Sequence, residues 1–393
     1  MINPLENVKI ARVSTVPFFI LAHLRSQLEI VNAAGADITV VASEDEKSDA
    51  INQLHYCKFK PIYIAREISL IADVITLFQL VKLFKTEQFD IVHSSTPKAG
   101  LLCALAAKLS KIPVRLHTFT GQPWVTMEGI KKSIVKFCDK IINSLNTHNY
   151  VDSFSQREFL IENKVVTPEK ITVLGSGSFG GVNLEKFNAK KFSDADRKQT
   201  KETLGINHDA LILLFVGRVT RDKGIFELIE AFSLLETNNS RLLIVGPFEL
   251  GLEQEIRNLA KHLCGDRIIF TGFCAEPERM MAVSDILCLP SYREGFGTVV
   301  IEAAAMSIPT IGTRIYGLTD AIVDGATGWL IQPKNVLQLK EAMQQLITDA
   351  PLRQSMGQNA YTRAVNEFDS KKCGALLVNE YKRLLNNRLN SRT

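Results

Sequence analysis

Short apolar runs alternate with longer helical patterns through most of this 393-residue chain. In the first half, the runs rich in β-branched and aliphatic residues are 8–13, 36–42, 89–95, 114–119 and 170–175. The helical patterns between them are 19–34, 68–86, 97–110 and 126–148. Fully apolar strands separated by helices are typical of parallel sheets covered on both faces. The first half is therefore predicted to be a doubly wound α/β domain.

A polar, charged segment at 184–209 interrupts the alternation, and we interpret it as an interdomain linker. A second series of apolar runs follows, at 211–217, 241–246, 267–272, 285–291, 309–313 and 328–332. The chain is helical in pattern from about residue 335 onward. These features predict α/β architecture with two doubly wound, Rossmann-like domains facing a cleft where the carboxyl ends of their strands meet.

The composition of the chain excludes several classes of function. The net charge of +4 is too small to indicate nucleic acid as a partner. The seven cysteines are scattered and never form CxxC, which indicates a reducing compartment and no zinc site. The N-terminus lacks a signal-peptide pattern, and no apolar stretch reaches the ~18 residues needed to span a bilayer. We expect a cytoplasmic protein, at most attached to the cytoplasmic face of a membrane.

The segment 215–232 carries the first candidate site. A strand ends at Gly217, a loop holds Arg218, Arg221 and Lys223, and a helix begins near Gly224. Backbone N–H groups at a helix start, with cations beside them, suit a phosphate group. The alternative is that these cations are only solvated.

The segment 291–309 carries the second candidate site. Glu294 lies in a loop whose glycines, Gly295 and Gly297, allow a close approach of backbone to a ligand. A helix begins near Thr298, and Glu302 is one turn into it. A carboxylate there can accept hydrogen bonds from a ribose diol. A glutamate that only complements the helix dipole is the alternative, but the combination of loop, glycines and two carboxylates disfavours it.

Together, GRVTRDKG (217–224) and EGFGTVVIE (294–302) resemble the nucleotide-sugar signature of the retaining family-four glycosyltransferases of the GT-B fold. DGATGWLI (324–331) and HTFTGQPW (117–124) extend the resemblance, and 94–121 is similar to members that build bacterial surface polysaccharides or lipid-linked oligosaccharides. The resemblance implies an acceptor-binding domain at 1–183, a nucleotide-sugar-binding domain at 210–370, and a helix at 371–393 that packs back on the first domain.

The resemblance also implies roles for individual residues. Arg218 and Lys223 would neutralise the donor diphosphate, Glu294 would contact the transferred sugar, and Glu302 would bind ribose. Backbone near the sugar and phosphate would come from Gly217, Gly295, Phe296, Gly297 and Thr298. His117 would lie beside the reacting centre, although a buried structural histidine is a fair alternative.

On the acceptor side, the candidate residues are Ser14, Thr15, Lys98 and Gly121. Lys98 precedes a helix where an anionic acceptor could bind, and a solvated lysine is the alternative. The loop at 11–19 contains Pro17 where many relatives carry glycines, and this departure weakens the assignment of Ser14 and Thr15. Asp320, in YGLTDAIV (316–323), receives no role.

Two motifs are set aside. GSGSFG (175–180) matches a dinucleotide fingerprint, but no long helix pattern follows it. DAD (194–196) is similar to a metal-binding motif of another glycosyltransferase fold, yet it lies in the charged segment with no buried strand before it. We therefore predict no metal and no cofactor.

Two helical stretches suggest a membrane partner. Residues 68–84 are apolar on nearly every side, which usually indicates a helix buried in a core or in an oligomer interface. Residues 130–142 place four lysines beside apolar side chains, as in helices that lie on anionic lipid. Because both stretches belong to the first domain, we hypothesise a peripheral contact with an anionic membrane.

The prediction is a glycosyltransferase that moves a hexose or N-acetylhexosamine from a nucleotide-diphosphate sugar, a UDP-sugar by resemblance, to a glycan or polyprenyl-linked acceptor. Retention of configuration follows from the resemblance alone. One alternative is a nucleotide-sugar epimerase of the same architecture. Another is a non-catalytic subunit that binds nucleotide sugars.

Overall fold

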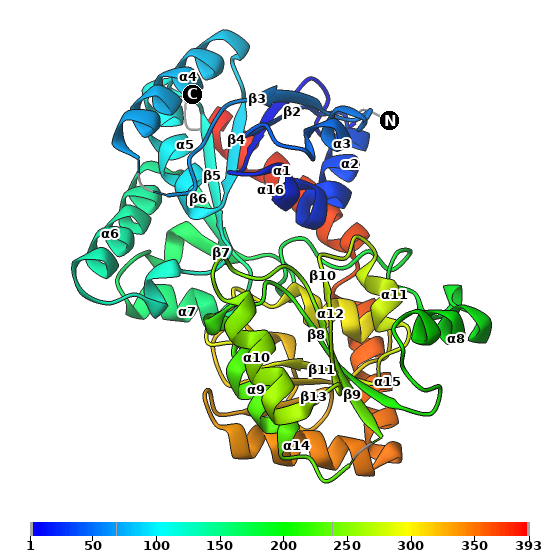
Figure 1. Ribbon diagram of the computed structural model, residues 1–393. Helices are drawn as coiled ribbons and strands as arrows, with labels where there is room; N and C mark the ends of the chain where they lie inside the picture. Colours follow the sequence, from blue (N-terminus) through cyan, green and yellow to red (C-terminus); the bar gives the residue numbers. More distant parts are fainter. Residues whose placement is uncertain (1–2, 68, 238, 391–393) are drawn as a thin grey trace. The chain divides into compact units, whose positions relative to one another are not determined.

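The computed structural model describes residues 3–67, 69–237 and 239–390. Some predicted ranges include residues 1–2, 68 or 391–393. At those positions the predictions lie outside the described residues. The chain divides into two compact units. The first runs up to Gly181 and resumes at Ser370, and the second is Val182–Asp369 (Figure 1).

The first unit is built on a seven-stranded parallel sheet in the order β3-β2-β1-β4-β5-β6-β7. Its strands are β1 (Lys9–Val13), β2 (Asp37–Ala42), β3 (Lys58–Pro61), β4 (Ile91–Ser95), β5 (Val114–Phe119), β6 (His148–Val151) and β7 (Ile171–Val173). The sequence did not reveal β3 and β6. β3 is a short edge strand with two lysines and a proline, and β6 reads HNYV, so neither has an apolar run.

Helices cover both faces of this sheet. They are α1 (Pro17–Phe19), η1 (Ile20–Leu24), α2 (Arg25–Ala33), α3 (Ser48–Asn52), α4 (Leu70–Glu87), α5 (Pro97–Leu109), η2 (Pro123–Thr126), α6 (Gly129–Leu145), α7 (Phe154–Glu162), η3 (Pro168–Lys170) and α16 (Ser370–Asn390). Successive residues of β1 point to opposite faces: Ile10 packs in the core under α2 and α16, and Ala11 in the core under α4 and α5. The C-terminal helix α16 packs beside α2, which confirms that the chain returns to the first unit (Figure 1).

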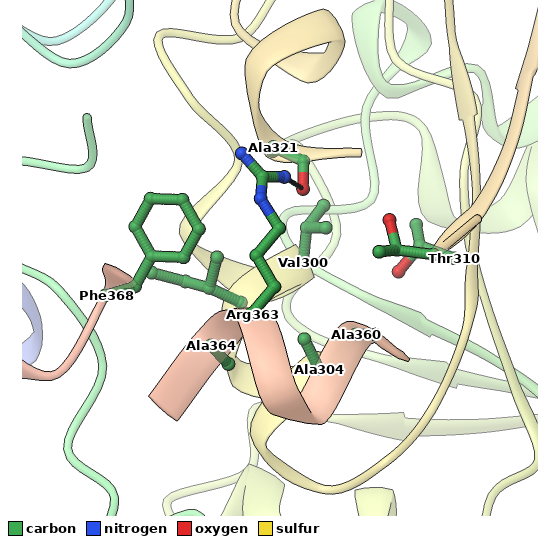
Figure 2. Close-up of a pocket in the computed structure, with 10 residues that line it drawn as sticks. Val300, Ala304, Thr310, Ala321, Ala360, Arg363, Ala364 and Phe368 are labelled. Atoms are coloured by element: carbon green, nitrogen blue, oxygen red, sulfur yellow. Dashed lines mark hydrogen bonds between the residues drawn. The ribbon is translucent and has the colours of Figure 1, made fainter. Parts of the chain in front are cut away.

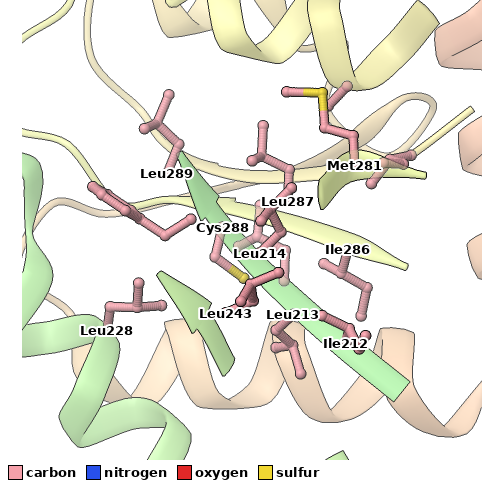
Figure 3. Close-up of a cluster of buried hydrophobic side chains, with 14 of the residues drawn as sticks. Ile212, Leu213, Leu214, Leu228, Leu243, Met281, Ile286, Leu287, Cys288 and Leu289 are labelled. Carbon is pink, nitrogen blue, oxygen red and sulfur yellow. The ribbon is translucent and has the colours of Figure 1, made fainter. Parts of the chain in front are cut away.

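The second unit contains a six-stranded parallel sheet in the order β10-β9-β8-β11-β12-β13. All six strands were predicted, and they are β8 (Leu211–Val216), β9 (Ser240–Val245), β10 (Ile268–Gly272), β11 (Ile286–Leu289), β12 (Thr310–Thr313) and β13 (Gly328–Ile331). The central strands are buried on both faces, and Figure 3 shows Leu213, Leu243 and Cys288 among the side chains that fill this core.

The helical segments of the second unit are η4 (Ala189–Lys191), α8 (Asp194–Thr203), η5 (Arg221–Lys223), α9 (Ile225–Ser233), α10 (Glu253–Cys264), α11 (Pro277–Met281), α12 (Thr298–Ala305), α13 (Leu318–Ala321), α14 (Val336–Thr348) and α15 (Ala350–Glu367). All seven cysteines of the chain are free thiols.

The segment 184–209, which we expected to be a linker, is folded as part of the second unit. Phe187 and Ile206 are buried in its core, so the polar composition hides two apolar anchors. The DAD motif begins α8, where Ser193 and Asp196 form a reciprocal capping box. The charged segment is therefore an amphipathic part of the second unit and not a linker. The boundary between the two units lies at 181/182 instead of 183/184.

Both sheets reverse their strand order at one point. In the first unit the reversal lies between β1 and β4, and in the second unit it lies between β8 and β11. The connections after such neighbouring strands leave in opposite directions, which opens a crevice at their carboxyl ends where ligands bind in this fold class. The two candidate donor loops follow β8 and β11, at the reversal in the second unit.

Candidate active site

Glycine brings the two loops of the second unit together. Gly224 begins α9 with φ of 70°, and a Cβ atom there would lie 2.2 Å from the carbonyl oxygen of Pro290. Only glycine allows this close approach of the loop after β8 to the loop after β11. The Tyr292 N–H donates to the Asp222 carbonyl at 2.8 Å, and Arg293 forms an ion pair with the Asp222 carboxylate at 3.0 Å. Sequence reasoning identified both loops but not these links between them.

Lys223 and Glu294 meet across the two loops. The Lys223 ammonium donates to Glu294 Oε1, and the Ser291 hydroxyl donates to the same oxygen at 2.8 Å. Both charged side chains are mostly shielded, with 19% of Lys223 and 13% of Glu294 exposed. Charge-assisted bonds in a shielded place are stronger than those at an open surface. The structure thus brings together two residues that the sequence predicted from separate motifs.

The two arginines of the β8 loop differ in their partners. Arg221 forms an ion pair with Glu255 at 2.7 Å and lies over the ring of Phe226. Arg218 is exposed, and its side chain makes no hydrogen bond or ion pair with any residue that the structure describes. Of these two cations, Arg218 is therefore the one available to an anionic ligand.

The start of α12 supplies the next part of the site. Gly297 precedes the helix with φ of 81°, and a Cβ atom there would lie 2.7 Å from Leu318 Cδ2. Thr298 opens the helix, so its first N–H groups point away from the helix body and can bind an anion. Phe296 is different, because its ring is buried against Phe368 at 5.2 Å between centroids. Only the backbone of Phe296 can then contact a ligand.

Glu302 lies one turn into α12 and has an unusual acidity. Burial raises its pKa to about 7, with the ammonium of Lys186 lowering it and the carboxylate of Glu278 raising it. Lys186 and Glu278 also pair with each other at 3.4 Å. Glu302 makes no hydrogen bond with another side chain among the described residues. A half-buried carboxylate without a side-chain partner is poised to accept hydrogen bonds from a ligand. Lys186 was missed, because it lies in the segment interpreted as a linker.

In the first unit, His117 is a buried residue of β5. Its side chain is 1% exposed, and Gly100 of α5 leaves it room, since a Cβ atom on Gly100 would lie 2.5 Å from the imidazole. Nδ1 is 3.0 Å from the Ser94 hydroxyl. Burial lowers the pKa of His117 to about 3, so the imidazole is neutral near pH 7. Its ring has the properties of a structural histidine.

The remaining acceptor-side candidates lie at the carboxyl ends of β1, β4 and β5. The Ser14 hydroxyl is fully buried and has no hydrogen-bond partner among the described residues. The Thr15 and Thr96 hydroxyls are 2.8 Å apart at the start of α5. Gly121 follows β5 with φ of 124°. Lys98 differs from our expectation, because its ammonium already pairs with Asp73 at 2.7 Å and donates to the Glu67 carbonyl at 2.6 Å.

Comparisons with known proteins agree with this architecture. The family model described as glycosyl transferases group 1 matches residues 196–363, in the second unit, and the model described as glycosyltransferase family 4 matches residues 22–177, in the first unit.

Relatives match along nearly the whole chain. The capsular polysaccharide biosynthesis glycosyltransferase CapM of Staphylococcus aureus is 30% identical over 370 residues, which cover 93% of this chain and 95% of that protein. The UDP-Gal:α-D-GlcNAc-diphosphoundecaprenol α-1,3-galactosyltransferase of Escherichia coli is 28% identical over 375 residues, with 93% and 94% covered. The fold and the two converging loops define a glycosyltransferase that depends on nucleotide sugars. The chain belongs to the glycosyltransferase family that these two models describe.

Solved structures place the fold as GT-B. Sucrose-phosphate synthase of Thermosynechococcus elongatus superposes with a TM-score of 0.81 at 22% identity, and the alignment covers 97% of this chain and all of that one. The Anabaena protein HepE, in complex with UDP and glucose, superposes with a TM-score of 0.78 at 17% identity and covers 98% of this chain. At these identities the likeness concerns the fold.

Proposed function

We propose that this glycosyltransferase moves a hexose or N-acetylhexosamine from a UDP-sugar to a lipid-linked glycan, with retention of configuration. The observation that carries the proposal is the contact between Lys223 and Glu294, which joins the phosphate loop to the sugar loop at the strand reversal of the second unit. Surface polysaccharide biosynthesis is the corresponding process, as the name of the S. aureus relative indicates for that protein.

The donor is proposed to lie on the second unit. Arg218 and Lys223 take the charge of the diphosphate, together with the N–H groups that open α12 at Thr298. Glu302 accepts hydrogen bonds from the ribose diol, and Glu294 contacts hydroxyls of the sugar. The glycines at 217, 295 and 297 allow the backbone to approach. These assignments combine the geometry with the family resemblance.

The transfer step needs a stabilised leaving group. The bond between the anomeric carbon and the diphosphate oxygen breaks, and a bond from the same carbon to an acceptor hydroxyl oxygen forms on the same face. The acceptor proton passes to the departing phosphate oxygen. Fixed cations stabilise the charge that builds on that oxygen, so we propose that no metal or cofactor is required. Transfer that persists in excess EDTA supports this assignment.

The acceptor is proposed to bind the first unit, near Ser14, Thr15 and Gly121. The E. coli relative and a Campylobacter jejuni relative, 24% identical over 358 residues, both carry diphosphoundecaprenol acceptors in their names. We extend that acceptor class to this chain. His117, neutral and near the end of β5, is proposed to support the carboxyl end of that strand in the first unit through packing and not through a charge.

A membrane face is the proposed location, because a polyprenyl acceptor is embedded in lipid. No helix within the described residues combines the length and apolar character needed to cross a bilayer. The segment 68–84 is not buried in the core on every side, because the outer side of α4 exposes apolar side chains, namely Leu70, Ile71, Val74, Ile75 and Phe78. The outer side of α6 exposes Ile130, Ile134 and Phe137 beside Lys131, Lys132 and Lys140. Both helices pack against α5, so we propose one lipid-binding surface, the α4/α6 surface.

The test is a transfer assay. Purified protein is incubated with a panel of UDP-hexoses and UDP-N-acetylhexosamines and with GlcNAc-diphosphoundecaprenol, and the product anomer is read by NMR. We expect one donor to be consumed only with acceptor and to give an α-linked product. A β-linked product would contradict retention. Conversion of the nucleotide sugar without acceptor would favour an epimerase, and binding of a nucleotide sugar without turnover on any acceptor would favour a non-catalytic subunit.

A further inference from the structure

Arg363 of α15 caps a short helix beside the donor loop. Its guanidinium donates from two nitrogens, to the carbonyl of Ala321 at 2.9 Å and to that of Asp320 at 2.7 Å. These are the last two carbonyls of α13, which has only four residues. Figure 2 shows the side chain reaching from α15 past Val300 of α12 to Ala321. A helix this short has almost no internal hydrogen bonds, so an external cap determines where it lies.

The other end of α13 lies directly against the donor loop. Gly317 precedes the helix with φ of 85°, and a Cβ atom there would lie 2.8 Å from the Glu294 carbonyl oxygen and 2.7 Å from that of Gly295. Leu318, the first helical residue, fills the space beside Gly297. Any shift of α13 would therefore displace the backbone on which Glu294 and the start of α12 depend.

A second chain of contacts leads from Arg363 to the same loop. The guanidinium lies over the ring of Phe368 at 5.0 Å, and that ring packs edge-on against Phe296 at 5.2 Å between centroids. Phe296 is the residue of the donor loop whose side chain turns into the core. Arg363 thus supports residues 294–298 from two sides, through α13 and through Phe368.

We infer that Arg363 is a positioning residue for the nucleotide-sugar site. Within the part of the chain that the structure describes, the hydrogen bonds, ion pair and ring contact of Arg363 involve no candidate donor group, so its effect is exerted through the backbone of residues 294–298. This inference rests on the proposed function, since it assumes that the loop holds the donor. This positioning role requires the geometry of a guanidinium. A planar group with several N–H donors can cap two carbonyls at once, whereas a lysine ammonium acts as a point charge.

The same helix offers a matched control. Arg353 of α15 donates to the last carbonyls of α14, those of Leu346 at 2.5 Å and Ile347 at 3.2 Å. It also caps the end of a helix, through Nη1 alone, but α14 has 13 residues, and none of them is among the atoms nearest to a Cβ placed on Gly297 or Gly317. Arg353→Ala therefore removes a helix cap, as Arg363→Ala does, but Arg363→Ala also removes the ion pair with Glu367 at 3.2 Å and the contact with Phe368. Both variants should lower the melting temperature, and Arg363→Ala should lower it more.

Hydrogen exchange of the ligand-free protein tests positioning without reference to any ligand. In Arg363→Ala, amides of residues 294–300 and 317–322 should exchange about tenfold faster than in the wild type, because local opening no longer breaks the cap. In Arg353→Ala those amides should exchange as in the wild type. Equal exchange of these segments in both variants would overturn the inference.

Calorimetric titration with UDP gives the functional result. Arg363→Ala should bind UDP about tenfold more weakly, Arg353→Ala within about twofold of the wild type, and Arg363→Lys in between. Wild-type affinity in Arg363→Ala would overturn the inference. If the wild type itself binds no UDP, the donor proposal fails, and the exchange measurement still decides whether Arg363 positions the loop.

Discussion

The Lys223 ammonium lies directly against the Glu294 carboxylate, so the loops after β8 and β11 neutralise each other's charge. A diphosphate that binds at Lys223 must compete with Glu294 for the ammonium. In the proposed donor site, this competition would release the carboxylate toward the hydroxyls of the sugar, while the Ser291 hydroxyl still donates to one of its oxygens at 2.8 Å. We therefore propose that the ion pair connects occupation of the phosphate site with the availability of Glu294 for the sugar.

Glu294→Gln should separate donor binding from transfer. The amide no longer neutralises Lys223, so UDP binding should be retained or become tighter. Transfer should fall by about 100-fold, because the group next to the sugar has lost its charge. Calorimetry with UDP and the initial rate of transfer measure the two quantities on one preparation. Loss of UDP binding in this variant would show that Glu294 serves the phosphate site instead.

Arg218→Ala should weaken UDP binding by about 10- to 100-fold, since a charge-assisted contact contributes about 1.5–3 kcal/mol. The melting temperature of the ligand-free variant should not change, because the side chain is exposed and has no partner among the described residues. Arg221→Ala is the control on the same loop, where the cation is already paired with Glu255. Equal losses in both variants would indicate a general effect of positive charge.

Binding of a nucleotide sugar should depend on the pH through Glu302. Its pKa of about 7 means that the carboxylate is mostly protonated at pH 6 and mostly ionised at pH 8, and only the ionised form accepts two hydrogen bonds from a diol. Affinity should therefore fall about tenfold from pH 8 to pH 6. A UDP-sugar is the suitable ligand, because the terminal phosphate of free UDP titrates in the same range. Glu302→Gln should bind more weakly at pH 8 and show no such pH dependence.

The raised pKa of Glu302 also predicts that the stability of the folded chain depends on pH, in the direction opposite to that of donor affinity. The folded-state pKa of Glu302 lies above its ordinary value of 4.5, so the proton binds more tightly to the folded chain. The resulting stabilisation is present below about pH 4.5 and is lost as the pH rises through about 7. Relative to the wild type, Glu302→Gln should therefore gain stability between pH 4.5 and pH 8. Denaturant unfolding at both pH values measures this, and a constant difference would contradict the assigned pKa.

The positions of the strands and of the two donor loops along the chain could be predicted because each strand of the second unit is a continuous apolar run that ends in glycine or a polar loop. The contacts between these loops could not be predicted, because they depend on which strands become neighbours. Nothing in the spacing of Lys223 and Glu294 along the chain shows that β8 pairs with β11. The register of a parallel sheet brings them together.

Lys98 and Lys186 illustrate the limits for single charges. Lys98 begins a helix, as an anion-binding residue would, yet Asp73 of α4 neutralises it. Lys186 lies in a charged segment without a motif, yet it influences the pKa of Glu302. Long-range pairing decides both outcomes, and a single sequence contains no record of it. The buried anchors Phe187 and Ile206 explain why the segment around Lys186 is folded.

The α4/α6 surface should bind anionic vesicles. Replacing Ile71 and Phe78 with glutamate removes two exposed apolar side chains of α4 and adds negative charge, so binding should be lost. Flotation with vesicles of phosphatidylglycerol and phosphatidylethanolamine measures this at physiological salt. Leu250→Glu, at a fully exposed apolar position of the second unit, is the control and should float like the wild type. A wild type that stays with the soluble fraction would rule out the surface.

The central claim is that residues 217–223 and 294–302 form the donor site. The most direct test is a thermal-shift panel of nucleotide sugars on the wild type, Arg218→Ala and Glu302→Ala. A ligand at 100 times its dissociation constant adds about 2.7 kcal/mol of stability, which is a clear rise in melting temperature. We predict that one nucleotide sugar stabilises the wild type and neither variant. Equal stabilisation of all three proteins would contradict the site.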